Sequence, residues 1–154
     1  MPSAWRIVNA RYAKQVFTGE GARREGGRWN SVGVPVVYLS AHRSLALLEI
    51  LARVSPAVAG DRYVFVEASW DNALMEPLPN RDLPAEWRAI PPTAATAAIG
   101  DGWIAEARSA VLAVPNVIIP AESNYLLNPA HPDFRRVKIG RPEPFLFDPR
   151  LLHA

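Results

Sequence analysis

Three residues with complementary chemistry lie close together in the sequence: Arg28, Tyr38 and Glu49. Arg28 follows two glycines in the run GGRWN. Glycines there let the backbone turn sharply, and an arginine so placed can clamp a phosphate through two parallel hydrogen bonds. Tyr38 offers an aromatic face and Glu49 a carboxylate. Together these groups could hold a dinucleotide and stabilise a positively charged sugar carbon.

Each of the three residues also has a purely structural interpretation. Arg28 could be a turn arginine in solvent, and Tyr38 a half-buried strand residue whose hydroxyl needs a partner. Glu49 could pair with Arg53, four positions later on the same helix. These alternatives stay open on the residues alone. They are not independent, however, because three consecutive elements can converge on one cleft.

The elements that would position these residues are a short strand and a helix. Alternating apolar residues predict a strand over 34–40, with Tyr38 and Ser40 on the same face. Ser40 can cap a helix over 41–54, which Pro56 ends. That helix is apolar almost all round, which is typical of a buried helix. An ionised Glu49 inside it would be costly unless the carboxylate were paired.

The rest of the chain mixes strands and helices without regular alternation. We expect strands at 5–8, 62–68, 111–114, 117–119, 135–139 and 145–147, loops at 19–27 and 75–92, and a helix from 93 to 107 that Gly100-Asp101-Gly102 interrupts. This order favours an α+β fold over a doubly wound sheet. The 154 residues contain no repeat or flexible linker, so we expect one compact domain over 1–154.

The composition excludes several classes of protein. Apolar residues make up 49% and charged residues 21%, as in globular proteins. The absence of cysteine excludes disulfides and thiolate chemistry, and the three histidines lack ligand spacing, so no metal site is expected. No long apolar run or signal-like segment is present, which favours the cytoplasm over a membrane. The net charge of +2 without a block of like charges argues against direct nucleic-acid binding.

Several longer blocks of the sequence resemble the RES-domain family, named for an arginine, a glutamate and a serine. The blocks are WRI at 5–7, GEGARREGGRWNSVGVPVVYLS at 19–40, LALLEIL at 45–51 and VPNVIIPAESNYLLNPAHPDF at 114–134. The resemblance implies a fold similar to ADP-ribosyltransferase toxins, with central antiparallel or mixed β-sheets and flanking helices. It also implies a toxin of a bacterial type II toxin–antitoxin pair that uses NAD⁺ as its substrate.

The resemblance carries particular roles onto this chain. The catalytic residues that it implies are Arg28, Tyr38, Glu49 and Ser123, and the NAD⁺-binding residues are Arg6, Arg28, Tyr38 and Asn124. The family serine is assigned to Ser123. Asn116 is the alternative, because it follows a Val-Pro pair where many relatives carry the serine. The partner that the resemblance implies is an Xre-type antitoxin that occludes the active site, within a higher-order complex.

The acceptor of the ADP-ribose group stays open. Water would make the protein an NAD⁺ glycohydrolase, inorganic phosphate a phosphorylase, and a protein side chain a mono-ADP-ribosyltransferase. Leu47 stands two positions before Glu49, where arginine-directed transferases carry a second glutamate. A nucleic-acid-acting toxin, or a module that only binds an antitoxin, are the alternatives from other classes.

Overall fold

A single mixed sheet organises the protein, whose computed structural model describes residues 1–53 and 62–151. The strands are β1 Ser3–Asn9, β2 Val37–Ser40, β3 Tyr63–Ser69, β4 Met75–Pro77, β5 Val111–Pro115, β6 Ser123–Leu127, β7 Lys138–Ile139 and β8 Glu143–Phe145. Their order is β4-β5-β6-β2-β1-β3-β7, and β8 also pairs with β3. Only the β4–β5 pair is parallel among these pairings. The α+β prediction is therefore confirmed.

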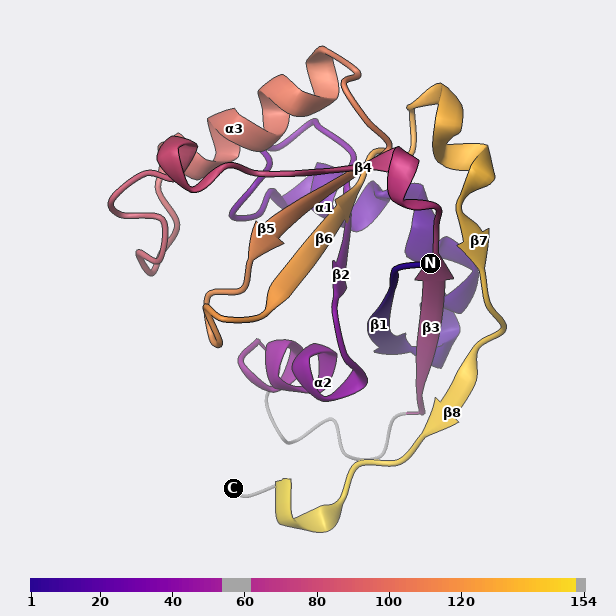
Figure 1. Cartoon of the computed structure of the whole chain (residues 1–154). Coiled ribbons are helices and arrows are strands. Elements are labelled where there is room, and N and C mark those ends of the chain that lie inside the picture. The colour runs from indigo at the N-terminus through magenta and orange to yellow at the C-terminus, as the bar shows by residue number, and fades with distance from the viewer. Residues whose placement is uncertain (54–61, 152–154) are drawn as a thin grey trace.

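Three α-helices accompany the sheet in the described ranges. They are α1 Glu20–Glu25, α2 Arg43–Leu51 and α3 Ala94–Ala105, and a 3-10 segment, Ala10–Thr18, follows β1. In the view of Figure 1, α3 lies across the top of the molecule and α2 lies near the lower end of β2. None of these helices is long and apolar enough to cross a membrane.

Successive strand residues point to opposite sides of the sheet, and buried apolar side chains cover both of its faces. Val37 and Leu39 of β2 pack with Trp70 in one cluster of buried residues. Val36 and the partly buried Tyr38 belong to a second cluster, on the other side of β2. That second cluster contains Trp29 and Trp103, so α3 is packed against the loop that follows α1.

The sheet opens between β1 and β2. These strands share a single residue pair, Trp5 with Ser40, whereas β1 pairs with β3 from Ser3 through Asn9. β2 remains fully paired with β6 on its other side. The edges that face each other across the gap are therefore free to bond with side chains rather than with a neighbouring strand.

The strand predictions at 5–8, 34–40, 62–68, 111–114 and 145–147 correspond to β1, β2, β3, β5 and, approximately, β8. Others were wrong. The predicted loop over 19–27 contains α1, the loop over 75–92 begins with β4, and no strand forms at 117–119. Of the strand expected at 135–139, only β7 forms, because the first two residues belong to the 3-10 segment Pro132–Arg136.

The predicted break in the helix over 93–107 was also wrong, since α3 runs without interruption through Gly100. The glycine serves packing instead. A Cβ built on Gly100 would lie 1.6 Å from the carbonyl oxygen of Trp29, so only glycine allows this contact. Next to it, Asp101 accepts hydrogen bonds from the backbone N–H and the hydroxyl of Ser31, at 2.9 and 2.5 Å.

Helix α2 is shorter and less buried than predicted. It begins after His42 rather than after Ser40, which lies in β2, and it ends at Leu51. The predicted end at Val54 lies outside the described residues. Only Leu45 and Ala46 are buried, and Leu48 is 40% exposed, so one side of this apolar helix faces outward.

Candidate active site

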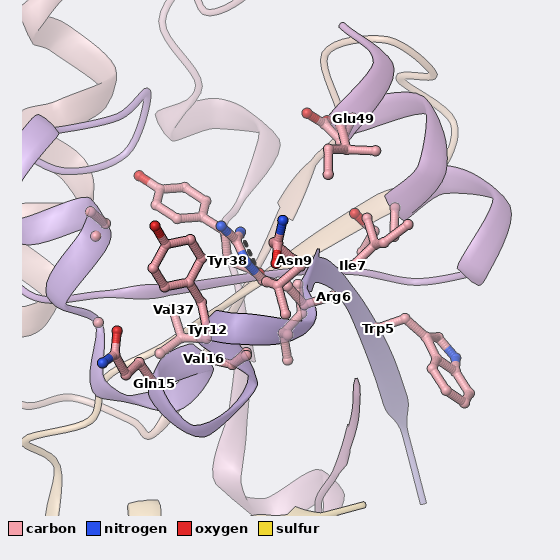
Figure 2. Close-up of a pocket in the computed structure, with 18 of the residues that line it drawn as sticks. Trp5, Arg6, Ile7, Asn9, Tyr12, Gln15, Val16, Val37, Tyr38 and Glu49 are labelled. Atoms are coloured by element: carbon pink, nitrogen blue, oxygen red, sulfur yellow. Dashed lines mark hydrogen bonds between the residues drawn. The ribbon is translucent and has the colours of Figure 1, made fainter. Parts of the chain in front are cut away.

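A cavity of about 540 Å³ lies where β1 and β2 separate. This volume is within the range of roughly 300–1,000 Å³ typical of small-molecule sites. Its walls come from β1, the 3-10 segment Ala10–Thr18, α1, β2 and α2, together with Asn124 of β6. Figure 2 shows Arg6 and Tyr38 side by side within this cavity, with Glu49 reaching in from another element. Four arginines and two glutamates are among the described residues that line it.

Glu49 is held in the wall of this cavity by two asparagines. The amide of Asn116 donates to Glu49 Oε1 at 2.7 Å, and the amide of Asn124 donates to the same oxygen at 3.4 Å. No described residue donates a hydrogen bond to Oε2. The pairing with Arg53 that the helix spacing allowed is absent from the ion pairs of the described residues. The carboxylate is thus oriented by neutral donors and keeps one oxygen available.

Asn116 is itself rigidly placed. It is fully buried, its Oδ1 accepts hydrogen bonds from the backbone N–H groups of Ile118 and Ile119, and its amide also donates to Asn124 Oδ1 at 2.9 Å. Every polar atom of the side chain is therefore engaged, which fixes the direction of the bond to Glu49.

Ser123, the first choice for the family serine, is not brought to the cavity. Asn124 lines the cavity, and neighbours in a strand point to opposite faces. Tyr125, two positions after Ser123, packs against Trp70 in the cluster on the other face. The structure thus places Asn116, the alternative position, beside the glutamate and leaves Ser123 on the opposite side of the sheet.

Arg6 lies inside the gap between β1 and β2. Its Nη1 donates to the backbone carbonyl of Tyr38 at 3.1 Å, which satisfies part of the edge that β1 leaves unpaired. Burial, together with the nearby positive charge of Arg53, lowers the pKa of Arg6 to about 10, although Tyr38 and Glu49 oppose the shift. The guanidinium is still cationic at neutral pH and is therefore a charge that an anion would stabilise.

The hydroxyl of Tyr38 is locked into the loop that carries Arg28. It donates to Asn30 Oδ1 at 2.5 Å and accepts from the backbone N–H of Trp29 at 3.1 Å. Burial raises the pKa of Tyr38 to about 12, so the phenol stays neutral. A Cβ on Gly27 would lie 2.7 Å from this hydroxyl, which explains the second glycine of the GGR run.

Asn30 connects the same loop to its surroundings and was missed from the sequence. It is 1% exposed, and its amide donates to the backbone carbonyls of Ala22, Ser31 and Val34. With the bond from Tyr38, both ends of the side chain are used. The signal in the sequence that could have indicated this role is the position of Asn30, two residues after Arg28.

Arg28 lies beside the cavity rather than in its wall. Its Nη1 donates to the carbonyl oxygens of Trp87 and Ala89, both at 2.8 Å, and so ties the GGR loop to the segment before α3. Burial lowers the pKa of Arg28, and the negative charge of Glu49 opposes part of this shift. Four of the predicted site residues, Arg6, Tyr38, Glu49 and Asn124, line the cavity; Arg28 and Ser123 do not.

Comparison with known proteins identifies a family and several relatives. The RES domain matches residues 3–148. A protein named Prs ADP-ribosylating toxin, from Sphingobium sp. (strain YBL2), is 39% identical over 155 residues, covering 97% of this chain and 96% of its own. A protein named Toxin Res, from Yersinia enterocolitica, is 36% identical over 148 residues, covering 96% of this chain and 97% of its own.

A solved structure shares the fold. The M. tuberculosis MbcT–MbcA toxin–antitoxin complex matches with a TM-score of 0.75 over 97% of this chain and 86% of that chain. Its sequence identity is 16%, so the match concerns the fold alone.

Proposed function

The chain belongs to the RES-domain family, and from this membership we propose that it is the toxin of a type II toxin–antitoxin system that acts on NAD⁺ in the cytoplasm. The reaction that we propose is cleavage of the bond between nicotinamide and ribose. The name of the Sphingobium relative, Prs ADP-ribosylating toxin, supports an activity on NAD⁺, and the presence of Arg6, Tyr38 and Glu49 in one cavity supports it further.

The observation that carries this proposal is the carboxylate of Glu49. Asn116 and Asn124 fix one of its oxygens at the cavity wall and leave the other without a described partner. A negative charge held in this way, before any substrate arrives, stabilises a positive charge that develops during a reaction. Neutral donors orient the carboxylate without neutralising it, as an arginine partner would.

The chemistry follows from the leaving group. The electron pair of the bond between the ribose C1 and the pyridinium nitrogen passes to that nitrogen, so nicotinamide leaves neutral and C1 becomes oxocarbenium-like. An acceptor oxygen or nitrogen then bonds to C1 and loses its proton. Glu49 would stabilise the cation and bond the ribose hydroxyls, and Tyr38 would present its ring face to nicotinamide. The role of Arg28 would be to hold the GGR loop in place through the two bonds of its Nη1.

The test is release of nicotinamide by purified protein. NAD⁺ labelled on the adenylate is incubated with and without inorganic phosphate, and the products are separated. Glu49→Gln keeps the shape of the side chain and removes its charge, so we expect a loss of about 10²–10³-fold in kcat with the thermal midpoint unchanged. Glu106→Gln, on an exposed carboxylate that pairs with Arg108, is the matched control. Full activity in folded Glu49→Gln would refute the proposed role.

A second candidate reaction is transfer of ADP-ribose to a protein, which the name of the Sphingobium relative favours. The same labelled NAD⁺, added with a cell lysate, separates the two reactions. Soluble ADP-ribose, or its phosphorylated form, indicates hydrolysis or phosphorolysis. Label retained on a protein band after denaturation indicates a transferase and identifies its target.

A further inference from the structure

Arg53 shares the cavity with Arg6 and Glu49. α2 tightens at its end: the backbone N–H of Ala52 bonds to the carbonyl of Leu48, and that of Arg53 bonds to Ile50. Arg53 therefore follows Glu49 by about one helical turn, roughly 6 Å along the axis, on the same side of the helix. The positive charge of Arg53 is close enough to lower the pKa of Arg6 across the cavity.

Neither cation has an ion-pair partner in the part of the chain that the structure describes. Among residues 1–53 and 62–151, no carboxylate lies within 4.0 Å of the guanidinium of Arg6 or Arg53. Among the hydrogen bonds of the described residues, Arg6 donates to the backbone carbonyl of Tyr38. Other arginines near the surface differ, since Arg43 pairs with Glu143 and Arg108 with Glu76 and Glu106. Two like charges that face one cavity, with only Glu49 nearby and no described carboxylate in contact with either, favour binding of an anion between them.

We infer that Arg6 and Arg53 together form a subsite for the diphosphate of the dinucleotide, with Glu49 one helical turn away at the ribose. The inference rests on the proposed function and adds Arg53, which the sequence suggested only as an ion-pair partner of Glu49. Guanidinium groups bind phosphate oxygens through two parallel hydrogen bonds. Two of them balance the two charges of a diphosphate, and Glu49 remains free to balance the cationic sugar.

The spacing fits the ligand. In a dinucleotide, one methylene group joins the reactive ribose to the diphosphate, so the groups that bind them must be near neighbours. Residues four apart on a helix satisfy this condition, because their side chains lie on one face. Arg53 is exposed while Arg6 is half-buried, so one cation lies deep in the gap and the other at a solvent-accessible position.

The experiment compares a ligand that contains the diphosphate with a ligand that lacks it. Dissociation constants are measured for ADP-ribose, which has it, and for nicotinamide riboside, which lacks it. Arg53→Gln should weaken ADP-ribose binding by about 10- to 100-fold and leave nicotinamide riboside binding within twofold, because each charge-assisted contact contributes on this scale. Arg53→Lys should recover part of the loss. Arg136→Gln, an exposed arginine outside the cavity, is the control and should change neither.

The outcomes separate this inference from the proposed function. Unchanged ADP-ribose affinity in Arg53→Gln, or equal weakening of both ligands, would overturn the subsite. If wild type binds ADP-ribose through Arg53 but does not release nicotinamide from NAD⁺, the subsite stands and the proposed reaction fails. If Arg53→Gln cleaves NAD⁺ with an unchanged KM, the reaction stands and the subsite falls.

Discussion

At the scale of single residues, the candidate site is organised by amides. Asn116 orients Glu49, and Asn30 receives the hydroxyl of Tyr38. In both cases a buried asparagine uses its donor and its acceptor at once, which leaves the side chain a single orientation. The groups proposed to meet the substrate are thereby fixed before it binds, as electrostatic stabilisation requires.

The fourth position of the family can be assigned by a pair of substitutions. Asn116→Ala should lower kcat by about 10- to 100-fold with little change in KM, because a misplaced carboxylate loses its alignment. Ser123→Ala should leave kcat within twofold, since Ser123 belongs to the opposite face of β6. Asn116→Ser should restore part of the activity. Steady-state kinetics on protein shown by circular dichroism to be folded would measure this, and the reverse ranking would return the role to Ser123.

Tyr38 predicts a dependence of stability on alkaline pH. Its pKa is raised to about 12 in the fold, against about 10 in an unfolded chain. Between these values the unfolded state loses its proton and the folded state keeps it, so the stability contribution is complete below pH 10 and is lost as pH rises toward 12. The loss should be about 2–3 kcal/mol for this largely buried group.

The variant that checks this is Tyr38→Phe. Its free energy of unfolding should be lower at neutral pH by about 1–3 kcal/mol, because Asn30 and the N–H of Trp29 lose their partner. It should then fall less steeply than wild type between pH 10 and 12. Urea unfolding at several pH values gives both quantities, and parallel curves for the two proteins would contradict the assignment.

At the scale of elements, α3 determines where the GGR loop lies. Gly100 touches the carbonyl of Trp29, and Asp101 receives both donors of Ser31. Arg28 adds two bonds to the segment before α3. The GGR loop, which also bonds the hydroxyl of Tyr38, is therefore attached at several points to α3 and to the segment before it. Both lie far from the loop in the sequence.

Two glycines of the same helix provide a matched test. Gly100→Ala should destabilise the fold by about 1–3 kcal/mol or more, since its methyl group meets a backbone carbonyl that cannot move freely. It should also lower activity, because the loop must shift. Gly102 has no atom within 4 Å of a built Cβ, so Gly102→Ala should stabilise by about 0.5–1 kcal/mol and keep activity. Urea midpoints and nicotinamide release compare the two, and equal effects would contradict this account of α3.

At the scale of the whole molecule, the opening of the sheet creates the site. Strands β1 and β2 share one residue pair and then separate, and the cavity occupies the space between them. The segments from Asn9 through Arg24 form another wall, and α2 closes the remaining side with Glu49 and Arg53. Tyr12 lines this cavity and is 52% exposed, so its position marks the accessible mouth of the cavity.

This mouth is where we propose that an Xre-type antitoxin binds. Occlusion predicts competition: the complex should release nicotinamide at least tenfold more slowly, and ADP-ribose should weaken antitoxin binding by the same factor as the antitoxin weakens ADP-ribose binding. Titration of the purified pair with ADP-ribose, followed by size-exclusion chromatography and calorimetry, measures both. A complex with full turnover would exclude occlusion.

The local parts of the site follow from the amino-acid sequence alone. Alternation in β2 placed Tyr38, helical spacing in α2 placed Glu49, and both follow from interactions between near neighbours in the chain. The family resemblance added Arg6 and Asn124, which do line the cavity. The positions of these residues could be predicted because strand and helix periodicity, or a matched motif, sufficed to specify them, while their roles remain predictions.

The partners that those residues meet depend on contacts between distant parts of the chain. Glu49 bonds to Asn116 across 67 positions, and Arg28 bonds to Trp87 and Ala89 across 59 and 61. The continuity of α3 likewise depends on Trp29, whose carbonyl explains Gly100. A prediction from local propensity considers only the near neighbours of a residue, so it expected Gly100 to interrupt the helix and allowed Glu49 to pair with Arg53. Packing between distant segments brings Glu49 to Asn116 and Asn124 and places Arg6 and Arg53 in the wall of one cavity.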